Sequence, residues 1–346
     1  FYQIHNFLHI HPGWIVFIFV STLYVLFYLN FFNLIKNIKI NKLYIFTIFS
    51  PLAFYFPVLN SKASGHKEII FLFFLSFFCY YLPKISHTRA YYFLILMILF
   101  LGFSHEGLIF YLTYLIIPFF LFYRFNNIRN VILYLIPILF LIIFIFLLNY
   151  FFSGNKQQVL DICNSVKDYV NNECINVGNI AHLAVTLKEY SIQKEFWAYG
   201  ETSLYPDYFI IYGVGLVIGF LPMMLLYNKA TLPKASHNLF IIHPLNLILL
   251  PFLITLPIYY IAADWGRYLY ISYMCSLITT FFYINNNVIF IKSTSKDKKQ
   301  NIFTKIIFVT LIAIYCLGWT VPICCEKKFK SGIFNAINRA TKLYNE

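Results

Sequence analysis

Three short polar clusters interrupt an otherwise apolar sequence, and their residue types could do chemistry. The clusters are Lys62 with Gly65-His66-Lys67-Glu68, then His105-Glu106-Gly107, then Asp264-Trp265-Gly266-Arg267. Arginine binds a phosphate or diphosphate through a bidentate fork, and lysine binds it as a point charge. Carboxylates and histidines can exchange protons with a substrate. The mixture therefore favours a substrate that carries a phosphate group and undergoes proton transfer.

Each cluster also has a purely structural explanation. Lys67 and Glu68 could begin a helix as an interfacial pair, and Asp264 with Arg267 could be a local ion pair that closes a hairpin. However, the clusters at Glu106 and Arg267 occupy loops too short to exist merely as solvated surface. Charged groups near a bilayer are costly and usually face a cavity or one another. We therefore interpret the three clusters as the lining of one polar cleft.

The composition indicates that this cleft belongs to a membrane protein. Of the 346 residues 60% are hydrophobic and 11% are charged, whereas a soluble domain carries roughly 25% charged residues. Such a chain cannot cover itself with a polar surface. We expect an all-α fold, a polytopic transmembrane helix bundle that forms a single domain over residues 1–346. The chain begins at Phe1 without a signal-peptide pattern, so we expect a truncated N-terminus.

Long apolar runs predict the helices that position the clusters. In lipid every backbone polar group must be satisfied internally, so each run that spans must be a helix. The predicted spans are 14–35, 43–58, 69–83, 90–104, 107–123, 131–152, 208–227, 244–262, 268–290 and 303–322. The stretch 90–123 is too long for one crossing at about 1.5 Å per residue, and the break at residues 104–107 divides it into a hairpin.

The distribution of charge predicts the orientation. Cytoplasmic loops retain Lys and Arg, and alternate gaps between the spans hold 14 and 7 of these residues. We place the richer set in the cytoplasm of a bacterial inner membrane. Of the 13 acidic residues only Asp297 falls in a cytoplasmic gap. The periplasmic face, with the larger loop 153–207, is therefore the one equipped for chemistry. The same topology puts the tail 323–346 outside, but the Lys and Arg residues of the tail conflict with the charge rule. An amphipathic surface helix or a miscounted span would each explain this conflict.

The remaining composition restricts partners and cofactors. We expect the basic loops that give the net charge of +13 to contact anionic lipid headgroups and not nucleic acid. Cys163 and Cys174 both fall in the outer loop, where a disulfide is plausible. Cys79, Cys275 and Cys316 fall inside spans, where cysteine is commonly a small apolar filler. Since no Cys and His spacing resembles a zinc site, we expect no metal and no cofactor.

At these residues the chain resembles bacterial polytopic membrane proteins of surface-polysaccharide assembly, of the O-antigen polymerase and EpsG-like type. The resemblance covers roughly residues 50–270 and rests on Ser50-Pro51, Phe56-Pro57, Gly65-His66-Lys67-Glu68, His105-Glu106-Gly107 and Asp264-Trp265-Gly266-Arg267-Tyr268. It implies a metal-independent, inverting glycosyl transfer between undecaprenyl-diphosphate-linked glycans on the periplasmic side. The chain departs from the better-described polymerases because it lacks a pair of long, Arg-rich outer loops.

The leading hypothesis is thus a membrane glycosyltransferase or polymerase with a lipid-linked glycan as substrate and other glycan-assembly proteins as partners. A sugar hydroxyl would attack the anomeric carbon of the donor, and lipid diphosphate would leave. Glu106 is the first candidate for general base and Asp264 the second, with His105 beside them. The predicted residues for binding diphosphate and sugar are Arg267, Lys67, Lys62, His66, Glu68 and Trp265.

Two alternatives from other classes stay open. A transporter or flippase would need polar residues through the full depth of the bilayer, whereas the charges here gather at the predicted outer ends of the helices. A non-catalytic scaffold of the assembly machinery predicts that substitution of Glu106 or Arg267 leaves glycan assembly intact.

Overall fold

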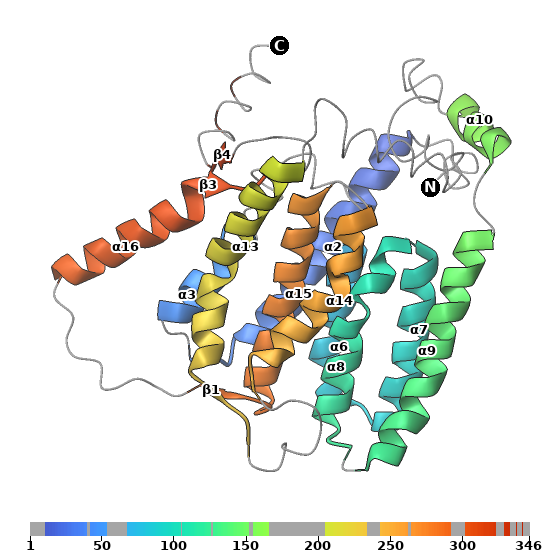
Figure 1. Ribbon diagram of the computed structural model, residues 1–346, viewed down its shortest axis with the longest axis horizontal. Helices are drawn as coiled ribbons and strands as arrows, with labels where there is room; N and C mark the ends of the chain where they lie inside the picture. Colours follow the sequence, from blue (N-terminus) through green and yellow to red (C-terminus); the bar gives the residue numbers. More distant parts are fainter. Residues whose placement is uncertain are drawn as a thin grey trace.

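The computed structural model describes most of the chain. The described residues are 11–39, 42–53, 68–104, 106–125, 127–151, 155–165, 205–233, 243–261, 264–291, 302–322 and 329–332, with 337 and 341. Helices dominate these residues (Figure 1), so the predicted all-α class is confirmed for this part of the chain.

The α-helices in chain order are α2 (Pro12–Ile35), α3 (Lys42–Ile48), α6 (Glu68–Tyr81), α7 (His87–Ser104), α8 (Thr113–Phe122), α9 (Ile128–Phe151), α10 (Lys156–Ser165), α13 (Tyr205–Asn228), α14 (Asn246–Ile261), α15 (Trp265–Asn285) and α16 (Ile302–Leu317). Two 3-10 helices, η1 (Leu82–Lys84) and η2 (Glu106–Tyr111), follow α6 and α7. The strands are β1 (Ala230–Thr231), β2 (Phe290–Ile291), β3 (Trp319–Thr320) and β4 (Lys330–Ser331). They form two antiparallel pairs, with Ala230 opposite Ile291 and Trp319 opposite Ser331.

Four described helical segments are long and apolar enough to cross a membrane. They are Gly13–Ile35, His87–Ser104, Ile128–Asn149 and Phe209–Asn228. Three apolar helical segments are shorter: Gly107–Phe122, Asn246–Tyr259 and Ile306–Leu317. The predicted break in the stretch 90–123 is confirmed, because α7 ends at Ser104 and the chain returns through η2 and α8 (Figure 1). Membrane crossing by the remaining predicted spans stays a prediction.

The helix predicted over 43–58 is confirmed up to Ile48 and is wrong for residues 49–53. Helix α3 ends at Ile48, and residues 51–53 form a turn. Pro51 explains the early end, because a residue that precedes proline is disfavoured in the helical region. Ser50 instead donates from Oγ to the carbonyl oxygen of Gly219 at 3.1 Å, which fixes this turn to α13.

Close backbone approach on α13 needs glycine. A Cβ atom added to Gly219 would lie 2.3 Å from Cδ1 of Leu52, and one added to Gly215 would lie 2.4 Å from Cγ1 of Val321. These two glycines, four residues apart, form the small-xxx-small pattern that lets membrane helices pack tightly. The pattern holds the turn after α3 and the segment after α16 against one face of α13.

Helix α15 lies at the centre of the bundle. Helices α2, α6, α8, α13 and α14 pack against it (Figure 1), and its residues 265–283 are all buried. Helices α7 and α9 pack together at one edge, and α16 lies at the opposite edge. The polar N-terminus of α15 is therefore surrounded by helices of the core.

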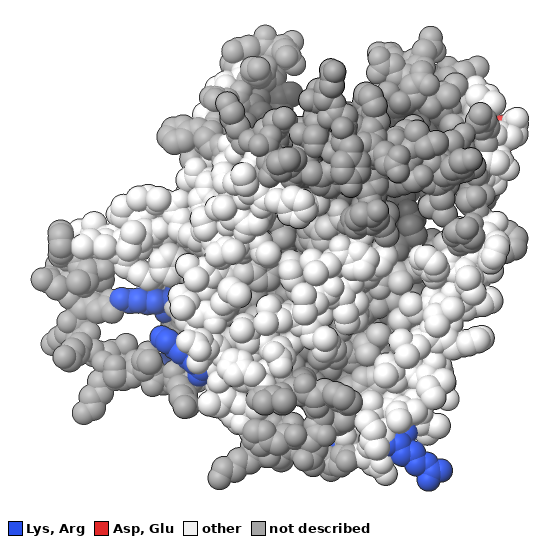
Figure 2. All heavy atoms as spheres, in the orientation of Figure 1, with Lys and Arg blue, Asp and Glu red and all other residues white. Residues whose placement is uncertain are grey.

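The two ends of the bundle differ in charge. Helix α10 and the N-terminus of α15 lie at the upper end in Figure 1, which we call the acidic end. Asp161 belongs to α10, Asp264 precedes α15, and Glu68 pairs with Arg267 of α15. The opposite end, which we call the basic end, holds the starts of α7 and α9 and the end of α13 (Figure 1). The described Lys and Arg residues other than Arg267 follow the ends of α2, α6, α8 and α13 or lie at the starts of α3, α7 and α9, namely Lys36, Lys39, Lys42, Lys84, Arg89, Arg124, Arg129 and Lys229. Figure 2 shows basic side chains in the lower half of the visible face and an acidic one at its upper edge.

Candidate functional site

Two of the three predicted polar clusters meet at the acidic end of the bundle. Glu68 is the first residue of α6, Asp264 immediately precedes α15, and Arg267 lies in the first turn of α15. Carboxylates are favourable at helix N-termini, where the backbone N–H groups carry partial positive charge. The packing of α6 against α15 brings Glu68 to Arg267, which lies 199 residues later (267 − 68) in the sequence.

Arg267 joins the two carboxylates. Its Nη2 lies 2.8 Å from Oδ2 of Asp264, and its Nε lies 3.2 Å from Oε1 of Glu68. Nη2 also donates to the hydroxyl oxygen of Tyr268 at 3.3 Å. Glu68 is 5% exposed and Arg267 is 7% exposed, whereas the side chain of Asp264 is 32% exposed. We call Glu68, Asp264 and Arg267 the ion network.

The charges of the ion network keep the guanidinium protonated. Burial lowers the pKa of Arg267, but the negative charges of Glu68 and Asp264, together with Tyr268, raise it, and the net shift is upward. The three charges of the network sum to −1. This sum disfavours the capture of a diphosphate by Arg267 itself, because two carboxylates already neutralise the guanidinium.

An aromatic cluster covers one side of the ion network. Nε1 of Trp265 donates to the carbonyl oxygen of Tyr259 at 2.7 Å. The Trp265 ring lies 5.3 Å from that of Phe209, 5.8 Å from that of Tyr212 and 5.9 Å from that of Tyr259. The ring of Tyr259 lies 5.7 Å from that of Tyr268. Trp265, predicted as a binding residue, is therefore a buried member of an aromatic wall beside the network.

The second predicted cluster is placed by its backbone. Glu106 begins η2, which packs against α7, α8 and α14. At the end of η2, Tyr111 donates from its hydroxyl to the carbonyl oxygen of Tyr268 at 3.4 Å. The η2 segment therefore lies beside the ion network, but the side chain of Glu106 is outside the described part. The predicted site residues Lys62, His66, Lys67 and His105 also fall outside the described residues.

Three polar residues near the network were not predicted from the sequence. Tyr259 and Ser272 are buried, and Tyr111 reaches the backbone of α15. Tyr259 lies five residues before Asp264, and Tyr111 lies five residues after Glu106. This closeness to the motifs could have identified both tyrosines from the sequence. Ser272 lies inside an apolar run, and no sequence pattern marks it as a site residue.

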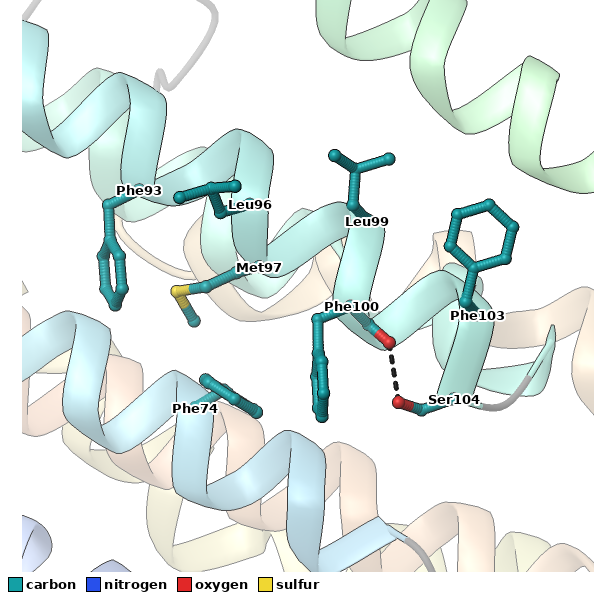
Figure 3. Close-up of a pocket in the computed structure, with 8 residues that line it drawn as sticks. All are labelled: Phe74, Phe93, Leu96, Met97, Leu99, Phe100, Phe103 and Ser104. Carbon is teal, nitrogen blue, oxygen red and sulfur yellow. Dashed lines mark hydrogen bonds between the residues drawn. The ribbon is translucent and has the colours of Figure 1, made fainter. Parts of the chain in front are cut away.

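A shallow groove of about 590 Å³ runs between α6 and α7 (Figure 3). Phe74 contributes one side, and the other lining residues are Phe93, Leu96, Met97, Leu99, Phe100, Phe103 and Ser104. The hydroxyl of Ser104 donates to the carbonyl oxygen of Phe100 at 2.6 Å, within its own helix. The groove therefore offers an apolar surface and no reactive group.

The predicted disulfide is supported at one of its two positions. Cys163, in α10, is disulfide-bonded. Cys174 lies outside the described residues, so the pairing of these two residues stays a prediction. Cys79, Cys275 and Cys316 are free thiols that are buried, as expected for apolar fillers.

The comparison with known protein families, characterised proteins and solved structures finds no match for this chain. The resemblance to surface-polysaccharide polymerases therefore stays a prediction, carried by the short motifs alone.

Proposed function

We propose that this chain is a multi-span inner-membrane glycosyltransferase that lengthens lipid-diphosphate-linked glycans at its acidic, periplasmic end. The observation that carries the proposal is the ion network, in which Arg267 holds Glu68 and Asp264 beside an aromatic wall. Carboxylates accept hydrogen bonds from sugar hydroxyls, and aromatic rings pack against the apolar faces of sugar rings. The combination suits a carbohydrate better than a small anion.

The geometry favours a revised set of roles. Arg267 orients the two carboxylates, since its Nε and Nη2 face them. Asp264, about one-third exposed, binds sugar hydroxyls from the solvent side. Lys62 and Lys67 supply positive charge for the leaving diphosphate, as expected from the sequence. The hydrocarbon chain of the carrier lies in lipid, for which the groove between α6 and α7 provides an apolar surface.

The test is glycan chain length in cells that lack the native gene and carry either the wild type or Asp264→Asn. Asp161→Asn is the matched control, because Asp161 is an exposed acid of α10 at the same end but outside the network. Wild type and the control should restore long glycan, whereas Asp264→Asn should leave single lipid-linked repeat units. Membrane levels of all three proteins are compared by immunoblot. Full-length glycan from Asp264→Asn would make the network structural and favour a scaffold.

A transporter is a second candidate because buried hydroxyls follow α15 below the network. Ser276 lies 3.2 Å from the Tyr114 hydroxyl, and Thr280 lies 3.0 Å from that of Tyr227. These hydrogen-bonded pairs place polar groups further along α15 than the ion network at its N-terminus. A transporter predicts that cells without the gene accumulate single repeat units on the cytoplasmic face, where an impermeant glycosidase added to intact spheroplasts does not reach them. A polymerase predicts accumulation on the periplasmic face.

A further inference from the structure

One carboxylate oxygen of Glu68 is buried and unused. Oε1 faces Arg267, but Oε2 is inaccessible to solvent and has no hydrogen-bond partner. Leaving a buried acceptor unpaired is costly, and the cost is larger for a charged group. Buried polar atoms of native proteins are therefore nearly always paired, and an exception calls for a functional explanation.

The two carboxylates of the network are not equivalent. Asp264 is about one-third exposed and is within reach of water, whereas Glu68 is 5% exposed. A donor that reaches Oε2 of Glu68 finds an acceptor without displacing a protein hydrogen bond. Oε1 meanwhile lies 3.2 Å from Nε of Arg267, an ionic contact that keeps the carboxylate beside the guanidinium.

Tyr268 connects Glu68 with the aromatic wall. The ring of Tyr268, close to the Glu68 charge, also lies 5.7 Å from that of Tyr259. The hydroxyl of Tyr259 and the Oγ of Ser272 are buried and lie near each other. The buried carboxylate of Glu68 is therefore close to an aromatic surface of the kind that packs against sugar rings.

The charged and titratable side chains that sense Glu68 come from two helices. Arg267, Tyr268 and Tyr270 face it from α15, and Tyr24 faces it from α2. Of these described neighbours, one is a permanent cation and three are phenols, which are poor bases at neutral pH. Asp264 binds the same guanidinium through Nη2, so Glu68 and Asp264 are the described carboxylates of this neighbourhood, and Glu68 is the one with an unpaired buried oxygen.

We propose that Glu68, and not Glu106, is the general base that activates the acceptor sugar in the glycosyl transfer proposed above, on which this inference rests. The acceptor hydroxyl donates its proton to Oε2 of Glu68. The hydroxyl oxygen forms the new bond to the anomeric carbon of the donor. The bond between that carbon and the phosphate oxygen breaks, and the lipid diphosphate leaves with the electron pair.

The test uses membrane vesicles from cells that lack the native gene and express the full chain, with their endogenous lipid-linked glycan as substrate. The rate of conversion of single repeat units into longer glycan is measured from acid to neutral pH. Wild type should lose rate toward acid pH as the base becomes protonated. Glu68→Gln should lower the rate by about 10²–10⁴-fold and remove this acid-side fall. Glu68→Asp should recover part of the rate and keep the fall.

Ser76→Ala is the matched control, because Ser76 is a buried residue of the same helix whose hydroxyl bonds to the carbonyl oxygen of Phe73. It should keep the wild-type rate and pH profile. If Glu68→Gln keeps the wild-type rate and pH profile, the inference about Glu68 is wrong, but the proposed function stands. The same conclusion follows if Glu106→Gln loses the fall in rate at acid pH and Glu68→Gln keeps it. If Glu68→Gln fails to insert, a Glu68→Asp protein without the acid-side fall overturns the inference about Glu68. Absence of any lengthening by wild-type vesicles would instead overturn the proposed function.

Discussion

Helices α15 and α9 are of similar length but occupy opposite environments. Helix α15 is buried along its length and contributes five of the eleven buried polar or charged residues of the described chain, namely Arg267, Ser272, Ser276, Thr279 and Thr280. Helix α9 is apolar, and its side chains are mostly exposed, for example Leu133 at 66% and Phe140 at 71%. The more apolar helix is the outer one.

This inversion is what a lipid environment predicts. Lipid tails are as apolar as leucine, so hydrophobicity alone does not select which helices are inside, and packing and hydrogen bonds decide. Polar side chains avoid lipid and gather between helices. Helix α15 carries the groups that need partners, and α9 carries those that do not. The comparison therefore supports the membrane assignment from side-chain placement as well as from composition.

The largest expected effect comes from the charge at the start of α15. Arg267→Met removes the cation from a buried network and leaves Glu68 and Asp264 without the charge that neutralises them. Loss of one partner from a buried ion pair typically costs about 3–5 kcal/mol. We expect a lower free energy of unfolding in detergent, measured by denaturant titration, whereas Arg129→Met at the exposed start of α9 should change little.

A triple variant sharpens this prediction. Replacing all three charges, with Glu68→Gln, Asp264→Asn and Arg267→Met, should recover most of the stability that Arg267→Met loses, because no unpaired charge remains. If the triple variant is no more stable than Arg267→Met, the loss arises from packing and not from charge.

The positions of the helices could be predicted from the sequence, but which helices are buried and which face lipid could not. The span predicted at 131–152 corresponds to α9, Ile128–Phe151, because an apolar run in lipid has no alternative to a helix. Helix α15 was also predicted, at 268–290, but nothing in the sequence indicated that it is the centre of the bundle. Apart from Arg267, its buried polar residues are uncharged and scattered, so their common burial depends on which helices surround them.

The candidate site was also predictable only where its residues are local. Asp264 and Arg267 are three residues apart, and their ion pair follows from helical spacing. The contact of Arg267 with Glu68 depends on the packing of α6 against α15, which no pattern in a single sequence reveals. The role expected for Arg267 as a diphosphate ligand ignored this second carboxylate.

An intermediate effect is expected from core packing. Leu277 of α15 is fully buried, and Leu133 of α9 is mostly exposed. Leu277→Ala leaves a cavity between packed helices and should cost about 2–5 kcal/mol, whereas Leu133→Ala should stay within about 0.5 kcal/mol. The two free energies of unfolding are compared in the same detergent. Equal losses would contradict the placement of α15 inside and α9 outside.

The smallest expected effect concerns the hydroxyls of α15. Tyr114 and Ser276 are hydrogen-bonded at 3.2 Å between α8 and α15, and such bonds between membrane helices average about 0.6 kcal/mol. Tyr114→Phe, Ser276→Ala and the double variant form a cycle whose coupling energy should be about this size. A coupling near zero would mean that the hydroxyls do little to hold α15 in place. Their burial along the axis of the bundle would then need another reason, and a path for a polar solute would become the stronger explanation.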